Sequence, residues 1–195
     1  MGNKKAKQKN KQPKKKKNSF LKDVVIIILA ALVLNFIIRG LIVDSRTVPT
    51  ASMYPTVAPK DRIIMSKLSY IFDNVPERGD VIVFTPPAEL NEKSDLLKRV
   101  IGLPGETVEV RDNLVYIDGE PLKEPYIYEA PNYIFGPVTV PEDSYLVFGD
   151  NRNSSLDSHL WIRQFVNIDS IKGKALFIFW PIDRMGGIYV ENTDN

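Results

Sequence analysis

The stretch LPGETVEVRDNLVYIDGE, residues 103–120, indicates the fold class of the chain. Polar and branched residues alternate in TVEV, and LVYI is rich in branched and aromatic residues; both patterns are typical of β-strands. Turn signals separate these runs, with RDN between them and Asp118-Gly119 after them. Pro104-Gly105 suits a type II turn, because proline fixes φ and glycine accepts a positive φ. The stretch therefore predicts short antiparallel strands joined by tight turns.

The same pattern continues on both sides of this stretch. No amphipathic helical segment of comparable strength follows residue 43, whereas strand-like runs recur at intervals of roughly ten residues. Residues 120–141, rich in proline and tyrosine, are expected to form a small irregular insertion. Residues 44–195 therefore predict one mainly β, antiparallel domain. The further strand-like runs are RIIMSKL (62–68), DVIVF (80–84), YLVF (145–148) and KALFIFW (174–180).

The N-terminal segment differs in composition from the rest of the chain. Residues 1–22 contain ten lysines and no acidic residue, which leaves 16 basic and 24 acidic residues in the remainder. A polar, lysine-rich segment cannot bury enough apolar surface to fold. Residues 1–22 are therefore expected to form a basic, disordered tail.

A membrane-length apolar segment follows this tail. Residues 24–38 (VVIIILAALVLNFII) are apolar except for one asparagine, and a few more residues bring the segment to the ~20 that cross a bilayer. A cationic run beside such a segment marks the cytoplasmic side and favours lipid over nucleic acid as its partner. No A-x-A-like cleavage site follows closely. Residues 23–43 therefore predict an uncleaved transmembrane anchor, with the N-terminus inside and the β domain outside.

The composition excludes several kinds of site. The chain has no cysteine, so it has no disulfide, no thiol nucleophile and no cysteine-based zinc site. Its single histidine, His159, disfavours a histidine-based metal cluster. We therefore expect neither a metal nor a cofactor.

TVPTASMYPT, residues 47–56, places Ser52 in a loop just after the predicted anchor. A serine hydroxyl becomes an effective nucleophile only when a base takes its proton. One candidate base is His159, with Asp150 and Asp157 near it in the sequence, which would give a Ser–His–Asp site. The other is Lys98, in DLLKRVIGLPGE.

Lys98 could act as a base if the strand around it is buried. Alternation with period two places Leu96 and Val100 on its face of the predicted strand. Its pKa would have to fall by ~3 units from ~10.4, and burial can supply such a shift. Taken singly, Ser52 could equally be a turn residue and Lys98 a snorkelling lysine. The residues alone leave both candidate bases open.

Four segments together resemble the type I signal peptidases, membrane-bound serine proteases that remove signal peptides from exported proteins. SMYPT resembles the nucleophile segment of that family, RGDVIVF a strand segment, KRVIGLPGE the lysine segment and GDNRNSSLDS the last segment. They occur in the family's order and span most of residues 47–161. The resemblance implies a catalytic core of two antiparallel sheets. It also implies cleavage of preproteins after small residues at positions −3 and −1.

The resemblance implies a role for each site residue. Ser52 would be the nucleophile and Lys98 the general base, acting through an acyl-enzyme. The backbone N–H of Ser52 and the hydroxyl of Thr50 would bind the oxyanion. His159 stands where many members have an arginine and is expected to pair with an aspartate. The implied supporting residues are Ser155, which hydrogen-bonds the lysine, Asp150, which pairs with Arg99, and Asp157 and Arg152 of the last segment.

The expected partners follow from the same resemblance. They are preproteins that carry a signal peptide and the lipid of a bacterial-type cytoplasmic or equivalent export membrane. Contact of the tail with the export translocase is a further hypothesis, and nucleic acid is not expected. Two alternatives remain: a non-catalytic, membrane-anchored β-domain binding protein, and a Ser–His–Asp protease that uses His159. The first is disfavoured because both Ser52 and Lys98 are present.

Overall fold

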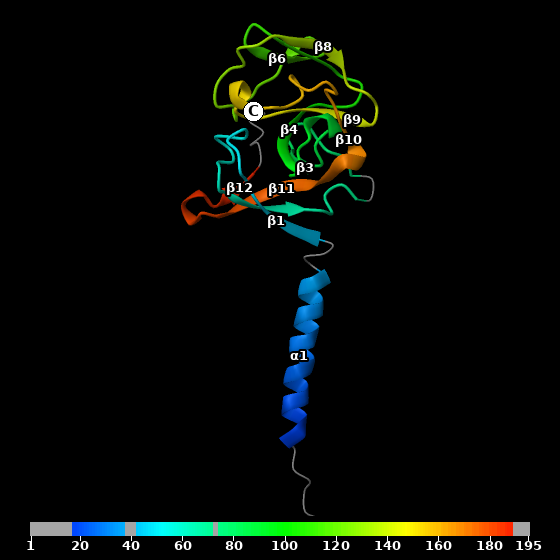
Figure 1. The fold of residues 1–195 in the computed structure, drawn as a ribbon, viewed down its shortest axis with the longest axis vertical. Coiled ribbons are helices and arrows are strands. Elements are labelled where there is room, and N and C mark those ends of the chain that lie inside the picture. Colours follow the sequence, from blue (N-terminus) through cyan, green and yellow to red (C-terminus); the bar gives the residue numbers. More distant parts are fainter. Residues whose placement is uncertain (1–16, 38–41, 72–73, 189–195) are drawn as a thin grey trace, which may run out of the picture. The chain divides into compact units, whose positions relative to one another are not determined.

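The computed structural model describes residues 17–37, 42–71 and 74–188 (Figure 1). The chain divides into two compact units, Met1–Ile38 and Arg39–Asn195. Most of the predicted tail, residues 1–16, lies outside the described residues.

The described part of the first unit is a single helix, α1 (Lys17–Ile37). Large apolar side chains such as Ile26, Ile27 and Leu32 are exposed along it. Among the residues that the structure describes, no helix is both long and apolar enough to span a membrane. The predicted anchor extended to Val43, which is the first residue of strand β1.

The second unit is built on antiparallel sheets, as the sequence predicts. The larger sheet has eight strands in the order β1-β2-β11-β3-β4-β9-β10, with β12 paired to β11. Strands β2, β3, β9 and β11 coincide with the predicted runs, whereas the short strands β1, β10 and β12 were not predicted. The bounds are β1 (Val43–Thr47), β2 (Arg62–Ser66), β3 (Val81–Phe84), β4 (Leu96–Gly102), β9 (Ser144–Phe148), β10 (Val166–Asn167), β11 (Ile171–Trp180) and β12 (Gly186–Gly187).

The smaller sheet, in the order β7-β6-β5-β8, contains the stretch LPGETVEVRDNLVYIDGE. Asp112 and Asn113, with φ of 52° and 62°, join β5 (Thr107–Arg111) to β6 (Leu114–Ile117). Asp118 and Gly119, with φ of 50° and 88°, join β6 to β7 (Glu120–Pro121). Two positive φ values in a two-residue loop match the right-handed twist of the flanking strands. The predicted hairpin turn at Asp118-Gly119 is therefore confirmed.

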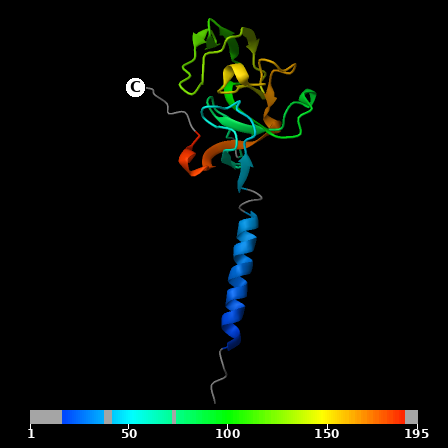
Figure 2. The same cartoon turned by 60° about the vertical axis from the view of Figure 1, so that its left-hand side comes forward.

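The segment predicted as an irregular insertion, residues 120–141, is partly regular. It contains β7 and β8 (Phe135–Thr139), and β8 pairs with β5. Gly136 and Pro137 lie inside β8, and both residues normally argue against a strand. This is why the sequence analysis missed it. Figures 1 and 2 show the smaller sheet at the end of this unit that lies away from β1 and β2.

Apolar clusters hold the two sheets together. One of them joins Val108 and Val110 of β5 to Leu146 and Phe148 of β9, all buried. Burying one such side chain stabilises the fold by about 1.5–3 kcal/mol. After residue 43, the helices of the described residues are short 3-10 turns: η2 (Ala88–Leu90), η3 (Arg152–Ser154), η4 (Ile168–Ser170) and η5 (Ile182–Arg184).

Candidate active site

Ser52 lies in the loop between β1 and β2, and buried neighbours fix its position. Met53 and Val57 are fully buried, and the Val57 N–H donates to the Met53 carbonyl at 2.8 Å. The Ser52 carbonyl accepts a hydrogen bond from the Asn151 N–H at 3.0 Å. The Asn151 side chain also donates to the Ala51 carbonyl at 3.2 Å. The loop after β9 therefore holds the serine backbone from the other side.

Lys98 comes from β4, which lies between β3 and β9 in the larger sheet. Its side chain is only 3% exposed, and its Nζ lies 2.7 Å from Ser52 Oγ. Burial lowers the pKa of Lys98 from 10.5 to about 8, although the carboxylates of Asp157 and Asp150 oppose the shift. A lysine with such a pKa is partly neutral near neutral pH, so it can accept the proton of a serine hydroxyl.

Thr50 places a second hydroxyl beside the serine. Its Oγ1 lies 3.4 Å from Ser52 Oγ. Both residues and Lys98 line a cavity of about 1100 Å³, together with apolar side chains such as Val83 and Leu97. This volume is slightly above the ~300–1,000 Å³ of typical ligand pockets. The cavity can therefore hold a short peptide segment next to the Ser52 hydroxyl.

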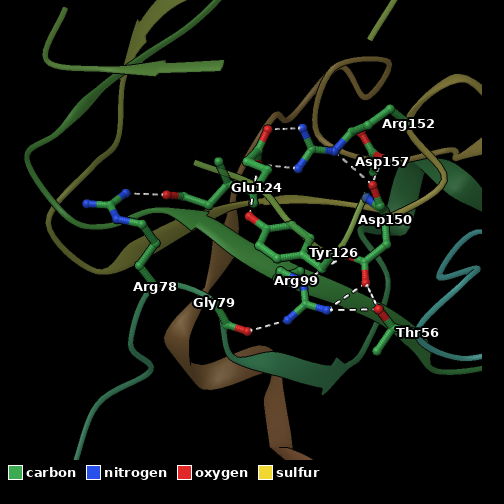
Figure 3. A network of polar contacts seen from close by, with 11 residues as sticks. Thr56, Arg78, Gly79, Arg99, Glu124, Tyr126, Asp150, Arg152 and Asp157 are labelled. Atoms are coloured by element: carbon green, nitrogen blue, oxygen red, sulfur yellow. Dashed lines mark hydrogen bonds and ion pairs between the residues drawn. The ribbon is translucent and has the colours of Figure 1, made fainter. Parts of the chain in front are cut away.

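The expected ion pair between Arg99 and Asp150 is present and fully buried (Figure 3). Arg99 Nε and Nη2 donate to the two carboxylate oxygens at 2.8 and 2.6 Å. A third guanidinium nitrogen donates to the Gly79 carbonyl at 2.7 Å, and Thr56 Oγ1 donates to Asp150 at 2.5 Å. The Arg99–Asp150 pair therefore connects β4, which carries Lys98, to the loop after β9. The sequence analysis missed the contribution of Thr56.

His159 pairs with Asp157, as the sequence analysis expects. His159 Nδ1 lies 2.6 Å from Asp157 Oδ1, and the other carboxylate oxygen accepts the Gly149 N–H at 2.8 Å. The imidazole stacks on the Tyr133 ring, with the two ring centres 3.9 Å apart. Within the described residues, the hydroxyl of Ser52 is hydrogen-bonded to Lys98 and Thr50 and not to the imidazole. The structure therefore does not assemble a Ser–His–Asp triad.

Ser155 is buried close to the pair but does not make the expected contact. Its hydroxyl has no hydrogen-bond partner among the described residues, so the implied bond to Lys98 is not made. The hydroxyl instead packs over Gly149, where an added Cβ would lie 2.3 Å from it. Only glycine fits at this position. Over the same residues, no group of three or more histidine, aspartate or glutamate side chains is placed to bind a metal.

Arg152 is buried and has a partner that the sequence analysis missed. Its guanidinium donates to both carboxylate oxygens of Glu124, at 2.7 and 2.5 Å. Burial lowers the pKa of Arg152, but the hydrogen bonds to Glu124 and the charge of that carboxylate, with smaller contributions from nearby tyrosines, together raise it. Glu124 lies in the predicted insertion, 28 residues from its partner. No local sequence signal marks a pair over that distance.

The comparisons with known proteins agree with the segment resemblance. A family model described as signal peptidase, peptidase S26, matches residues 21–180. Signal peptidase I of Leptolyngbya laminosa is 46% identical over 176 residues, covering 88% of this chain and 85% of that protein. Probable signal peptidase I-1 of Synechocystis sp. is 45% identical over 172 residues, covering 86% of each.

A crystal structure of a signal peptidase I from Enterococcus faecalis is 37% identical in sequence, with a TM-score of 0.45. The match covers 52% of this chain and 97% of that chain. The family model spans most of the chain, and both cyanobacterial relatives match over most of their own length. The chain therefore belongs to the type I signal peptidase family.

Proposed function

We propose that this protein is a membrane-anchored signal peptidase that cleaves signal peptides from exported preproteins, with Ser52 as nucleophile and Lys98 as general base. The observation that supports this assignment best is the 2.7 Å contact between Lys98 Nζ and Ser52 Oγ in a buried setting. Burial keeps the lysine partly neutral, and a neutral amine at this distance can remove the hydroxyl proton.

The reaction begins when neutral Lys98 accepts the proton of Ser52 as Oγ attacks the scissile carbonyl carbon. The backbone N–H of Ser52 and the hydroxyl of Thr50 bind the oxyanion that forms. When the C–N bond breaks, the protonated lysine gives its proton to the leaving amine, and an ester to Ser52 remains. Water, deprotonated by the same lysine, then hydrolyses this ester. An oxyanion donor typically contributes about 3–4 kcal/mol to such a reaction.

The preprotein occupies the cavity beside the Ser52 hydroxyl as an extended segment. Its residues at positions −3 and −1 point toward the cavity walls and must be small. Buried or half-buried side chains such as Val83 and Leu97 support this assignment, because they limit the space at the walls. In a packed wall even one extra methylene on the substrate costs about 1–3 kcal/mol of binding.

Residues 23–43 anchor the protein in the export membrane, with residues 1–22 inside and residues 44–195 outside as the catalytic domain. The exposed apolar side chains of α1 support this arrangement, because such a surface is stable in lipid rather than in water. The lysines that precede the apolar run favour the cytoplasmic face and anionic lipid. Contact of the tail with the export translocase would add to that attraction.

The test is cleavage of one preprotein with alanine at −3 and −1 by the full chain in detergent. Lys98→Ala and Ser52→Ala should abolish cleavage, whereas His159→Ala should retain most of it. Lys123→Ala, at an exposed position, serves as the matched lysine control. Cleavage that survives in Lys98→Ala but disappears in His159→Ala would replace the lysine by a histidine base. If the unaltered chain does not cleave the preprotein, the proposed activity itself is refuted.

A further inference from the structure

The ion pair between Glu124 and Arg152 is almost completely shielded from water. The side chain of Arg152 is 0% exposed and that of Glu124 is 5% exposed. Glu124 comes from the segment between β7 and β8, and Arg152 from the short helix η3 after β9. The pair therefore connects the smaller sheet to the loop that supports Ser52.

Arg152 also binds the backbone of that loop. Its Nε donates to the Gly149 carbonyl at 3.0 Å, and the Gly149 N–H donates to Asp157 at 2.8 Å. Gly149 is packed directly against the serine, because an added Cβ would lie 2.4 Å from the Ser52 carbonyl oxygen. The guanidinium therefore fixes the peptide on which the backbone of Ser52 rests.

Glu124 reaches the same loop through a second set of contacts. The Tyr126 hydroxyl donates to Glu124 Oε1 at 2.9 Å, and the guanidinium carbon of Arg99 lies 4.1 Å from the centre of the Tyr126 ring. Figure 3 shows Tyr126 between Glu124 and Arg99, which in turn pairs with Asp150. Glu124 is thus bonded directly to Arg152 and is joined through Tyr126 to Arg99, the other buried arginine of the site.

We infer that Glu124 is a positioning residue for the reaction: through Arg152 it holds the Gly149 backbone against Ser52, and so sets the geometry between Ser52 and Lys98. The inference rests on the proposed function. Its physical basis is the high cost of leaving a buried guanidinium without its carboxylate. Without Glu124 the cation must reach water or another carboxylate, and its hydrogen bond to Gly149 is then strained or lost.

The test compares Glu124→Gln with Glu129→Gln in the full chain in detergent, below the melting temperature of both. Glu129 is an exposed acid in the same segment, so this control removes the same charge without opening the buried pair. Glu124→Gln should lower kcat by at least about tenfold with little change in KM, since small displacements of reacting groups are costly in rate. Glu129→Gln should change neither constant.

A pH profile separates positioning from a merely structural role. With Glu124→Gln the unpaired cation of Arg152 can act on the nearby Asp157, which binds the same Gly149 peptide and whose charge raises the pKa of Lys98. The pH at which the rate is half-maximal should therefore fall. Glu124→Asp keeps the charge, so it should keep the unaltered midpoint, but its shorter side chain displaces Arg152 and should still lower kcat. It is the variant to measure if Glu124→Gln does not fold.

The outcomes separate this inference from the proposed function. A normal kcat and pH midpoint in Glu124→Gln, with a lower melting temperature alone, would make the pair structural and overturn the inference. If Glu124→Gln does not fold, a normal kcat in Glu124→Asp, with a lower melting temperature alone, would do the same. Absence of cleavage by the unaltered chain would instead remove the proposed function, whatever the variants show.

Discussion

Replacing Lys98 by methionine should make the domain more stable at neutral pH. The protonated amine is disfavoured in the folded protein because burial lowers the pKa of Lys98 from 10.5 to about 8. Below pH 8 the lysine is charged in both the folded and the unfolded chain, so the full cost of burying the charge is present. This cost disappears as pH rises from the folded pKa to the unfolded pKa, because both states are then neutral.

The size of the effect follows from these two values. A difference of about 2.5 units corresponds to about 3.4 kcal/mol in the free energy of unfolding. Methionine cannot make the hydrogen bond to Ser52, and this loss offsets about 1 kcal/mol of the gain in stability. The net gain at pH 7 is therefore about 2 kcal/mol, or about 4–8 °C in Tm for a domain of this size. Near pH 10 the remaining cost of the charge is about 1 kcal/mol, so the gain should vanish.

The measurement is thermal unfolding of the unaltered chain, Lys98→Met and Lys123→Met, followed by circular dichroism at pH 7 and at pH 10. Lys123 is exposed, so its replacement should change Tm little at either pH. Two results would refute the reasoning. One is a Lys98→Met variant that melts below the unaltered chain at pH 7. The other is a gain in Tm that is as large at pH 10 as at pH 7.

Three further predictions concern the site. The value of kcat/KM should rise about tenfold per pH unit below the Lys98 pKa of about 8 and level off above it, because the neutral amine is the proposed base. A kcat/KM that falls over this range would contradict the proposed role. Thr50→Val should lower kcat by about 10²–10³-fold in single-turnover assays, and an unchanged kcat would remove Thr50 from the oxyanion site. Gly149→Ala should lower Tm, because the added methyl group costs about 1–3 kcal/mol of folding free energy in this tightly packed site. Gly186→Ala, where the added methyl group meets open space, should leave Tm unchanged. Equal melting temperatures of the two variants would contradict the tight packing at Gly149.

Local sequence signals were sufficient where the structure depends on neighbouring residues. The alternation in TVEV and the branched and aromatic residues of LVYI predict two strands, and Asp118-Gly119 predicts the turn that follows, because backbone conformation and side-chain direction are local properties. The sequence analysis missed β8 because it relied on the same local preferences. Its Gly136 and Pro137 are unfavourable in a strand, and only pairing with β5 overrides that preference.

The contacts of the site required more than local patterns. The family resemblance predicted that Ser52 and Lys98 act as a pair, and the structure places the two side chains in contact. Glu124 was not predicted, because its bonds to Arg152 depend on how the chain returns after the smaller sheet. The bond expected from Ser155 to Lys98 is not made among the described residues. Motif matching supplies residue identities, whereas hydrogen bonds depend on the path of the chain between the motifs.

The support of Ser52 by the loop after β9 has a consequence for how the protein is made. Lys98 lies 46 residues after the serine, and Asn151, which binds the serine backbone, lies about a hundred residues after it. Contacts of such separation form late, because long loops must close first. A growing chain that already includes both Ser52 and Lys98 still lacks the peptide that holds the backbone of Ser52. We therefore expect the contact geometry of Ser52 to be complete only once nearly all of the domain has been synthesised.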